Sequence, residues 1–215
     1  MQADTQPTTE AETKKKKSTF REYAEALAIA FIIALFIRTF IVHPFKIPSE
    51  SMLPTLEVGD QIMVNKFIYG AKIPFFRNTI IPGSTPQRGD IVVFIYPLDK
   101  SKDFIKRVIA LGGEEVEIKD KKIFINGELY EDTHGIYTDN VIIPGSSRPR
   151  DNMKPLVVPP NALFVMGDNR DDSLDSRFWG VVEQKDIIGK AFIIYWSWDG
   201  KTFRPRWDRV FNLLK

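Results

Sequence analysis

The sequence predicts a mainly β protein: an antiparallel sheet with a small inserted β lobe, preceded by one N-terminal transmembrane helix. Three observations lead to this fold class. An almost uncharged apolar stretch lies near the start of the chain. Short runs rich in β-branched and aromatic residues follow it, and clusters of Pro and Gly near residues 82–89 and 144–160 separate them. Long helical periodicity is missing beyond the apolar stretch.

The apolar stretch covers residues 26–42, and Arg38 is its one charged residue. Its 17 residues are at the short end of what crosses a bilayer as a helix. Residues 1–17 are polar and end in four lysines at 14–17, which is typical of a disordered tail. We therefore expect a basic cytoplasmic tail over residues 1–21 and a membrane anchor over residues 22–42.

The charges on either side of this stretch indicate its orientation. The lysines at 14–17 and Arg21 precede it, whereas only Lys46 follows closely. The positive-inside rule then leaves the N-terminus in the cytoplasm and residues 43–215 outside. A buried core helix is one alternative, and the basic flank argues against it. A cleavable signal peptide is another, but no small-x-small cleavage site follows the apolar run.

The short runs after residue 43 are interpreted as strands of one domain. They cover residues 61–66, 90–96, 103–111, 116–118, 122–125, 129–130, 162–166 and 187–196. Asn126-Gly127 between two of them is a strong signal for a type I′ hairpin turn. Residues of about 113–160 are predicted to form the inserted lobe.

Composition excludes several classes of function. The chain has 30 Lys and Arg against 28 Asp and Glu, a net charge of +2, which is small for a nucleic-acid-binding protein. It has no cysteine, which removes disulfides, thiolate metal sites and a cysteine nucleophile. His43 and His134 are its only histidines, and Gly-x-Ser-x-Gly, His-Glu-x-x-His and Walker A motifs are absent. We expect no metal, cofactor or nucleic acid.

Residues 47–56 are the first segment that could carry chemistry. Ser49 and Ser51 stand between Pro48 and Pro54, whose fixed φ angles constrain the backbone. On spacing alone the segment could equally be a linker leaving the membrane. Ser51 is nine residues past the apolar stretch, roughly 30 Å if fully extended. A nucleophile at this serine would therefore lie near the bilayer surface.

A lysine in the expected strand 103–111 is the second candidate. Strand alternation places Phe104, Lys106 and Val108 on one face. Burial between apolar neighbours would lower the pKa of a lysine from about 10.4 toward neutrality. A neutral amine could deprotonate a serine. The alternative is an exposed lysine with Arg107 facing the core, and periodicity does not decide between them.

The polar loop 167–177 is the third candidate and follows the expected strand 162–166. Loops mounted on a rigid sheet often carry function. A solvated turn with local Asp–Arg pairs explains the same composition equally well.

Together these segments resemble the bacterial type I signal peptidases. The matching blocks run in order along most of residues 20–197, behind an anchor of the expected orientation. They are 48–56, Gly59-Asp60 with Val64 and Lys66, 88–94, 105–107, and 167–177 continuing to Trp179-Gly180. Each block alone is modest, but the ordered set is highly specific.

The resemblance implies a serine endopeptidase with a Ser/Lys dyad. Ser51 would be the nucleophile and Lys106 the general base, acting as a neutral amine. The oxyanion hole would use the backbone N–H of Ser51 and the hydroxyl of Ser49. Such a hole stabilises the tetrahedral intermediate where negative charge develops.

The resemblance also assigns supporting roles around the dyad. Ser173 would hold the lysine amine in place, and Asp175 and Arg177 would form a structural pair. Substrates would carry small side chains, typically alanine, at the first and third positions before the cut. The residues expected to line the substrate pocket are Phe45, Ile47, Pro48, Met52, Val93 and Ile105.

The implied function is removal of N-terminal signal peptides from exported preproteins by a single-pass protein of the bacterial plasma membrane. Two alternatives remain open: a Ser/Lys self-cleaving repressor, and a membrane-tethered β module that binds exported proteins without cleaving them. The apolar residues 73–81 and the tail 203–214 are expected either in the bilayer interface or packed on the sheet.

Overall fold

The computed structural model describes residues 19–36, 42–72, 79–81 and 83–214. The chain divides into two units, residues 1–37 and 38–215. The first contains helix α1 (Thr19–Phe36), which holds no Gly or Pro. Among the described residues, no helix combines the length and the apolar character needed to span a membrane.

The expected anchor 22–42 stays a prediction, and its bounds differ from those of the observed helix and strand. Helix α1 begins three residues earlier, at Thr19, and Val42 is the first residue of strand β1 (Val42–Lys46) rather than part of a helix. Residues 37–41 of the expected anchor lie outside the described residues.

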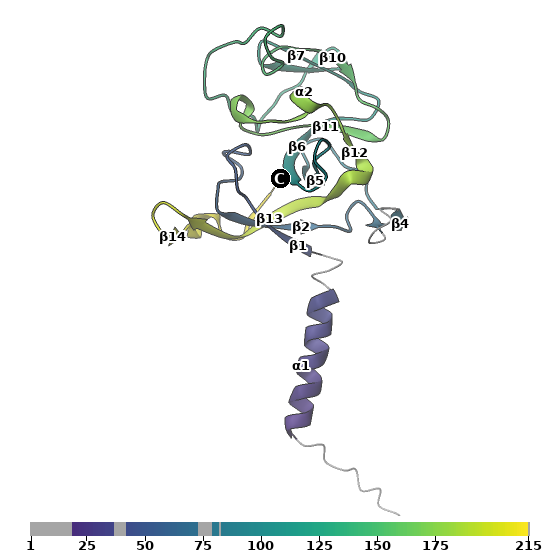
Figure 1. Cartoon of the computed structure of the whole chain (residues 1–215), viewed down its shortest axis with the longest axis vertical. Helices are drawn as coiled ribbons and strands as arrows, with labels where there is room; N and C mark the ends of the chain where they lie inside the picture. The colour runs from purple at the N-terminus through teal and green to yellow at the C-terminus, as the bar shows by residue number, and fades with distance from the viewer. Residues whose placement is uncertain (1–18, 37–41, 73–78, 82, 215) are drawn as a thin grey trace, which may run out of the picture. The chain divides into compact units, whose positions relative to one another are not determined.

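The second unit is built on a nine-stranded antiparallel sheet, which confirms the mainly β, antiparallel part of the predicted fold class (Figure 1). Its main path runs β1-β2-β13-β5-β6-β11-β12, and β14 and β15 add to β13. Besides β1, the strands are β2 (Asp60–Asn65), β5 (Ile91–Ile95), β6 (Asp103–Leu111), β11 (Ala162–Met166), β12 (Val182–Glu183), β13 (Ile187–Asp199), β14 (Arg204–Pro205) and β15 (Asn212–Leu213). A separate two-stranded sheet pairs β3 (Ala71–Lys72) with β4 (Thr79–Ile81).

Residues 113–160, which we call the lobe, join β6 to β11 and carry a four-stranded sheet in the order β10-β7-β8-β9. The strands are β7 (Glu115–Lys119), β8 (Lys122–Ile125), β9 (Glu128–Leu129) and β10 (Met153–Val157). Two-residue turns at Asp120-Lys121 and Asn126-Gly127 join the hairpins, and all four of these residues have positive φ. The predicted Asn-Gly turn is confirmed, and it has the type I′ signs of φ.

Three hydrophobic clusters stabilise this unit. One lies between the lobe and the main sheet, where Ile118 and Ile123 meet Ile109 and Phe164. The other two clusters contain consecutive residues of β5, whose side chains point to opposite faces of the strand. Val93 belongs to one cluster and Val92 to the other. Figure 1 shows β7 and β10 of the lobe near β11 and the short helix α2 (Ser176–Trp179). The lobe is therefore packed onto the sheet through a shared core.

The sequence missed two five-residue strands, β1 and β10. Both contain a proline, Pro44 in β1 and Pro155 in β10, and both lie at the edge of their sheet. Proline removes a hydrogen-bond donor, so it is tolerated at edges and weakens the strand signal in a sequence.

The tail 203–214 pairs with β13 through β14 and β15, with a turn of 3₁₀ helix (Trp207–Arg209) between them. Its side chains do not all pack, however. Phe203, Trp207, Phe211 and Leu213 are largely exposed, although the Trp207 ring meets Trp196 edge-on at 5.6 Å. For the other apolar segment, only the backbone of β4 is described, so its expected contact with lipid lies outside the described residues.

Candidate active site

Ser51 lies in a tight turn that follows β1. The backbone N–H of Leu53 donates to the carbonyl of Glu50 at 3.1 Å, and that of Leu56 donates to Met52 at 2.8 Å. Met52 and Leu56 are fully buried in the cluster around Val93. The alternation of buried and open positions therefore fixes the turn on the core and leaves the Ser51 hydroxyl at the surface.

The structure brings Lys106 to this hydroxyl from β6. The Nζ of Lys106 lies 2.6 Å from the Oγ of Ser51, and it donates to the carbonyl of Ile105 at 2.8 Å. Lys106 pairs across the sheet with Val92, and its Nζ lies 5.7 Å from the centre of the Phe104 ring. Only 4% of Lys106 is exposed, so the side chain is largely removed from water.

Burial lowers the pKa of Lys106 from 10.5 to about 8. The carboxylates of Asp175 and Asp168 oppose this shift, and the guanidinium of Arg177 adds to it. Neither carboxylate makes a hydrogen bond with the amine, so the cost of desolvation dominates. A large share of the amine is therefore neutral near pH 8 and can accept a proton.

Loop 167–177 is hydrogen-bonded to the turn that carries Ser51. The backbone N–H of Asn169 donates to the carbonyl of Ser51 at 3.1 Å, and its side-chain amide donates to the carbonyl of Glu50 at 3.3 Å. A Cβ at Gly167 would lie 2.3 Å from the Ser51 carbonyl oxygen. Only glycine allows the loop to approach this closely.

Asp175 and Arg177 form a fully buried, two-point ion pair in this loop. The Nε and Nη2 of Arg177 each donate to the Asp175 carboxylate at 2.8 Å. Asp175 also accepts from the backbone N–H of Gly167 at 3.1 Å. Burial alone would raise the pKa of Asp175, but the charge and hydrogen bonds of Arg177 hold it below its usual value. The pair is therefore ionised and fixes the shape of the loop.

The two other serines of the expected site lie close by. Ser49 is exposed, and its Oγ is 3.5 Å from the Oγ of Ser51. Ser173 is buried beside Gly167. In the part of the chain that the structure describes, no hydrogen bond joins the Ser173 hydroxyl to the amine of Lys106, which bonds to Ser51 and Ile105 instead. Ser173 acts on Asp175, where it helps to lower the pKa of the carboxyl. The structure thus brings Ser173 near the site without joining it to the lysine.

A cleft of about 400 Å³ opens beside the Ser51–Lys106 contact. Its lining residues are Pro48, Ser49, Glu50, Ser51, Asp103, Phe104, Ile105, Lys106, Asp172 and Leu174. Of the six expected pocket residues, Pro48 and Ile105 line the cleft. Phe45, Ile47, Met52 and Val93 do not, because they form or pack against the apolar cluster beneath it.

A second buried ion pair was missed by the sequence interpretation. Arg107, fully buried, donates from Nε and Nη2 to Asp168 at 2.8 and 2.7 Å, and from Nη1 to the carbonyl of Gly89 at 2.7 Å. Thr55 donates to the same carboxylate at 2.6 Å. All four residues fall within the matching sequence blocks, which was the only available signal. The sequence analysis treated a buried Lys106 and a core-facing Arg107 as alternatives. That was wrong, because both side chains are buried.

Comparison with known proteins identifies the family. The family described as "Signal peptidase, peptidase S26" matches residues 20–196. A signal peptidase I of Pseudomonas aeruginosa is 39% identical over 93% of this chain and 81% of its own length. One of Pseudomonas fluorescens is also 39% identical, over 95% of this chain and 82% of its own length.

A crystal structure of a signal peptidase I from Enterococcus faecalis V583 aligns with 32% identity and a TM-score of 0.41, over 50% of this chain and 97% of that one. The sequence matches extend over nearly the whole chain and include every segment around the cleft. The chain therefore belongs to the signal peptidase family, peptidase S26, and is a serine endopeptidase of the signal peptidase I type.

Proposed function

We propose that this protein removes N-terminal signal peptides from exported preproteins, with Ser51 as nucleophile and Lys106 as general base. The observation that carries this proposal is the 2.6 Å contact between the Lys106 amine and the Ser51 hydroxyl. An amine supports this chemistry only when it is neutral, and the buried position of Lys106 favours the neutral form. The named relatives support signal peptides as the substrate class.

The proposed reaction has two stages. In the first, Lys106 takes the proton of Ser51, whose oxygen attacks the scissile carbonyl carbon. The tetrahedral intermediate collapses, the C–N bond breaks, and the proton passes to the leaving amine of the mature chain. In the second stage, Lys106 takes a proton from water, and the hydroxide attacks the acyl carbon. The ester C–O bond to Ser51 then breaks, the protonated lysine returns its proton to the Ser51 oxygen, and the signal peptide leaves with a new carboxylate. Each stage leaves the lysine neutral.

The negative oxygen of each intermediate needs hydrogen-bond donors. We assign this role to the backbone N–H of Ser51 and the hydroxyl of Ser49, which lies 3.5 Å from the attacking oxygen. Ser49 is exposed at the cleft, so its hydroxyl can turn toward a bound substrate. The Lys106 amine and the Ser49 hydroxyl thus both lie close to the attacking oxygen, at 2.6 and 3.5 Å.

The decisive test uses the full-length chain in detergent with a purified preprotein. Ser51→Ala and Lys106→Met should each lower kcat at least about 10³-fold, since nucleophile and base act as one unit. Lys102→Met removes an exposed lysine just before β6 and should cleave normally. Urea unfolding would verify that each variant is folded. Appreciable cleavage by either folded dyad variant would refute the mechanism, and no cleavage by the wild type would favour a binding module.

We also propose single-pass anchoring in the bacterial plasma membrane through the apolar stretch, with the N-terminus in the cytoplasm and the tail at the bilayer surface. The largely exposed Phe203, Trp207, Phe211 and Leu213 support the contact of the tail with lipid. In vesicles of brominated lipid, the fluorescence of the wild type should be quenched, and Trp207→Phe should lose much of that quenching. Equal quenching in both proteins would remove the tail from the interface.

A further inference from the structure

A network of charged groups connects the lobe to loop 167–177. Its centre is the carboxylate of Asp171, whose side chain is only 2% exposed. This carboxylate accepts from the Nζ of Lys121 at 2.7 Å and from the backbone N–H groups of Thr138 and Asp139 at 2.8 and 3.0 Å. Every one of these donors belongs to the lobe.

Lys121 is placed for this contact by its hairpin turn. It follows Asp120 between β7 and β8 with a φ of +68°, and its side chain is 12% exposed. The Nζ also donates to the backbone and side-chain oxygens of Asp139 at 3.0 and 3.1 Å and lies 5.3 Å from the centre of the Tyr137 ring. A single amine thus joins the hairpin, the segment 137–139 and the loop.

A second connection holds the other end of the loop. The Nη1 of Arg177 donates to the backbone carbonyl of Arg150 at 2.8 Å. Arg150 in turn forms ion pairs with Asp139 and with Asp151, each at 2.8 Å. The part of the loop that carries Ser173 and Asp175 therefore lies between two attachments to the lobe.

These attachments matter for the dyad because the loop is one wall of the place where Lys106 is buried. The charged groups that face the Lys106 amine are Asp168, Asp175 and Arg177, and all three belong to this loop. The loop also holds Ser51 through the backbone N–H of Asn169. A loop that moved outward would admit water to the amine and loosen the nucleophile together.

We propose that Lys121 of the lobe is a positioning residue of the protease: through Asp171 it holds loop 167–177 against the dyad and keeps water from the Lys106 amine. This inference rests on the proposed roles of Ser51 and Lys106. It gives the lobe a part in the reaction, although no lobe residue lines the cleft.

The test compares Lys121→Met with the wild type by measuring kcat and KM across pH. The variant should lose about tenfold in kcat at neutral pH, with KM within about twofold, because the loss concerns alignment of the dyad rather than substrate contacts. Its acid limb should move up by about half a pH unit, since hydration of Lys106 favours the charged amine. Lys121→Arg keeps a cation at this position and should recover most of the rate.

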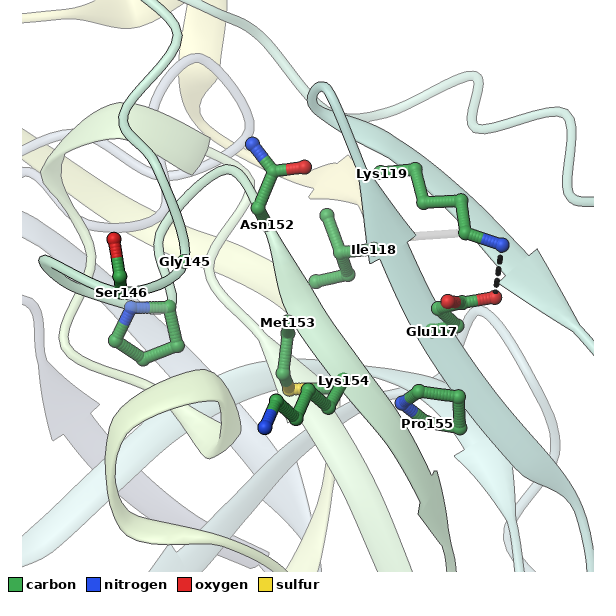
Figure 2. A pocket seen from close by; sticks show the side chains of 10 residues that line it. Glu117, Ile118, Lys119, Gly145, Ser146, Asn152, Met153, Lys154 and Pro155 are labelled. Carbon is green, nitrogen blue, oxygen red and sulfur yellow. Dashed lines mark ion pairs between the residues drawn. The ribbon is translucent and has the colours of Figure 1, made fainter.

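Lys119→Met is the matched control. Lys119 lies two residues earlier on β7 with 60% of its side chain exposed, and its Nζ pairs with Glu117 at 2.7 Å at the edge of an open groove on the lobe (Figure 2). The Lys119→Met variant removes the same charge from the lobe without touching Asp171, so it should keep the wild-type rate and pH profile. Asp171→Asn should resemble Lys121→Met, and the double variant should be no worse than either.

Equal kcat and an equal acid limb for Lys121→Met and Lys119→Met would overturn the proposal. The midpoint of the acid limb does not depend on how much enzyme is active, so it remains decisive if Lys121→Met folds poorly. An unmoved midpoint in the folded fraction would also overturn it. Failure of the dyad itself would look different, because Lys106→Met would then retain activity.

Discussion

Lys106 and Arg107 are neighbours on β6, and both cations are buried, with exposed fractions of 4% and 0%. The guanidinium of Arg107 meets the Asp168 carboxylate through two hydrogen bonds. Among the described residues, the amine of Lys106 meets only a hydroxyl and a backbone carbonyl at hydrogen-bonding distance. The same strand therefore buries one charge with a full counter-ion and one without.

The difference between them explains their separate roles. Arginine stays charged at any pH a protein tolerates, so a paired guanidinium can only fix structure. Lysine can lose its proton when it is buried without a bonded carboxylate, and the pKa of Lys106 falls to about 8. Burial alone thus does not identify a base; the partner of the buried cation does.

Of the variants that test this comparison, Lys106→Arg should have the largest effect, a loss of kcat. It keeps a cation on the same strand but removes the neutral form, so kcat should fall at least about 10³-fold at every pH, as much as in Lys106→Met. Preprotein cleavage by the purified variant between pH 6 and 10 measures this. Activity that returned at high pH would show that the neutral amine is not what the reaction needs.

Among these variants, Asp168→Asn should cause the largest loss in the free energy of unfolding. It leaves the Arg107 guanidinium buried without a counter-ion, which costs about 3–5 kcal/mol in the free energy of unfolding. Replacing both partners, in Arg107→Met with Asp168→Leu, should cost much less, since no charge then remains buried. Urea unfolding at pH 7 measures both variants. A loss below about 1 kcal/mol in Asp168→Asn would indicate that the pair contributes little.

Lys106→Met should change the free energy of unfolding in the opposite direction and stabilise the protein. The folded pKa of Lys106 is about 8 against 10.5 for an ordinary lysine, so at pH below 8 folding carries the full cost of burying a cation. At about 1.4 kcal/mol per pKa unit, the variant gains up to about 3 kcal/mol at pH 7. The wild type should recover this difference as pH rises from 8 to 10.5. A variant less stable than the wild type at pH 7 would contradict the assigned cause.

The pH dependence of cleavage should show the smallest of these effects. The neutral fraction of Lys106 falls below its pKa of about 8, so kcat/KM should drop about tenfold for each pH unit under that value. Rates measured with one preprotein from pH 5 to 9 suffice, and a midpoint near pH 6 would assign the base to another group.

Much of the sheet could be predicted from the sequence because its strands carry strong local signals. The runs 103–111, 122–125 and 162–166 coincide with β6, β8 and β11. Strands with weak local signals were missed, as in β1 and β10, where proline sits at a sheet edge. The cleft was predicted only in part, because whether a side chain lines a cleft or the core beneath it depends on how separate segments pack.

By itself, the sequence determined the mainly β fold class, the order of the matching blocks and the identity of Ser51 and Lys106 as candidates. Strand alternation and turn chemistry act over a few residues, so a sequence displays them directly. Only the tertiary structure decided that Lys106 lies against Ser51, that Arg107 is buried with Asp168, and that the lobe holds Asp171. Those contacts join segments some 50 to 61 residues apart, and they depend on which neighbours fill the space around each charge.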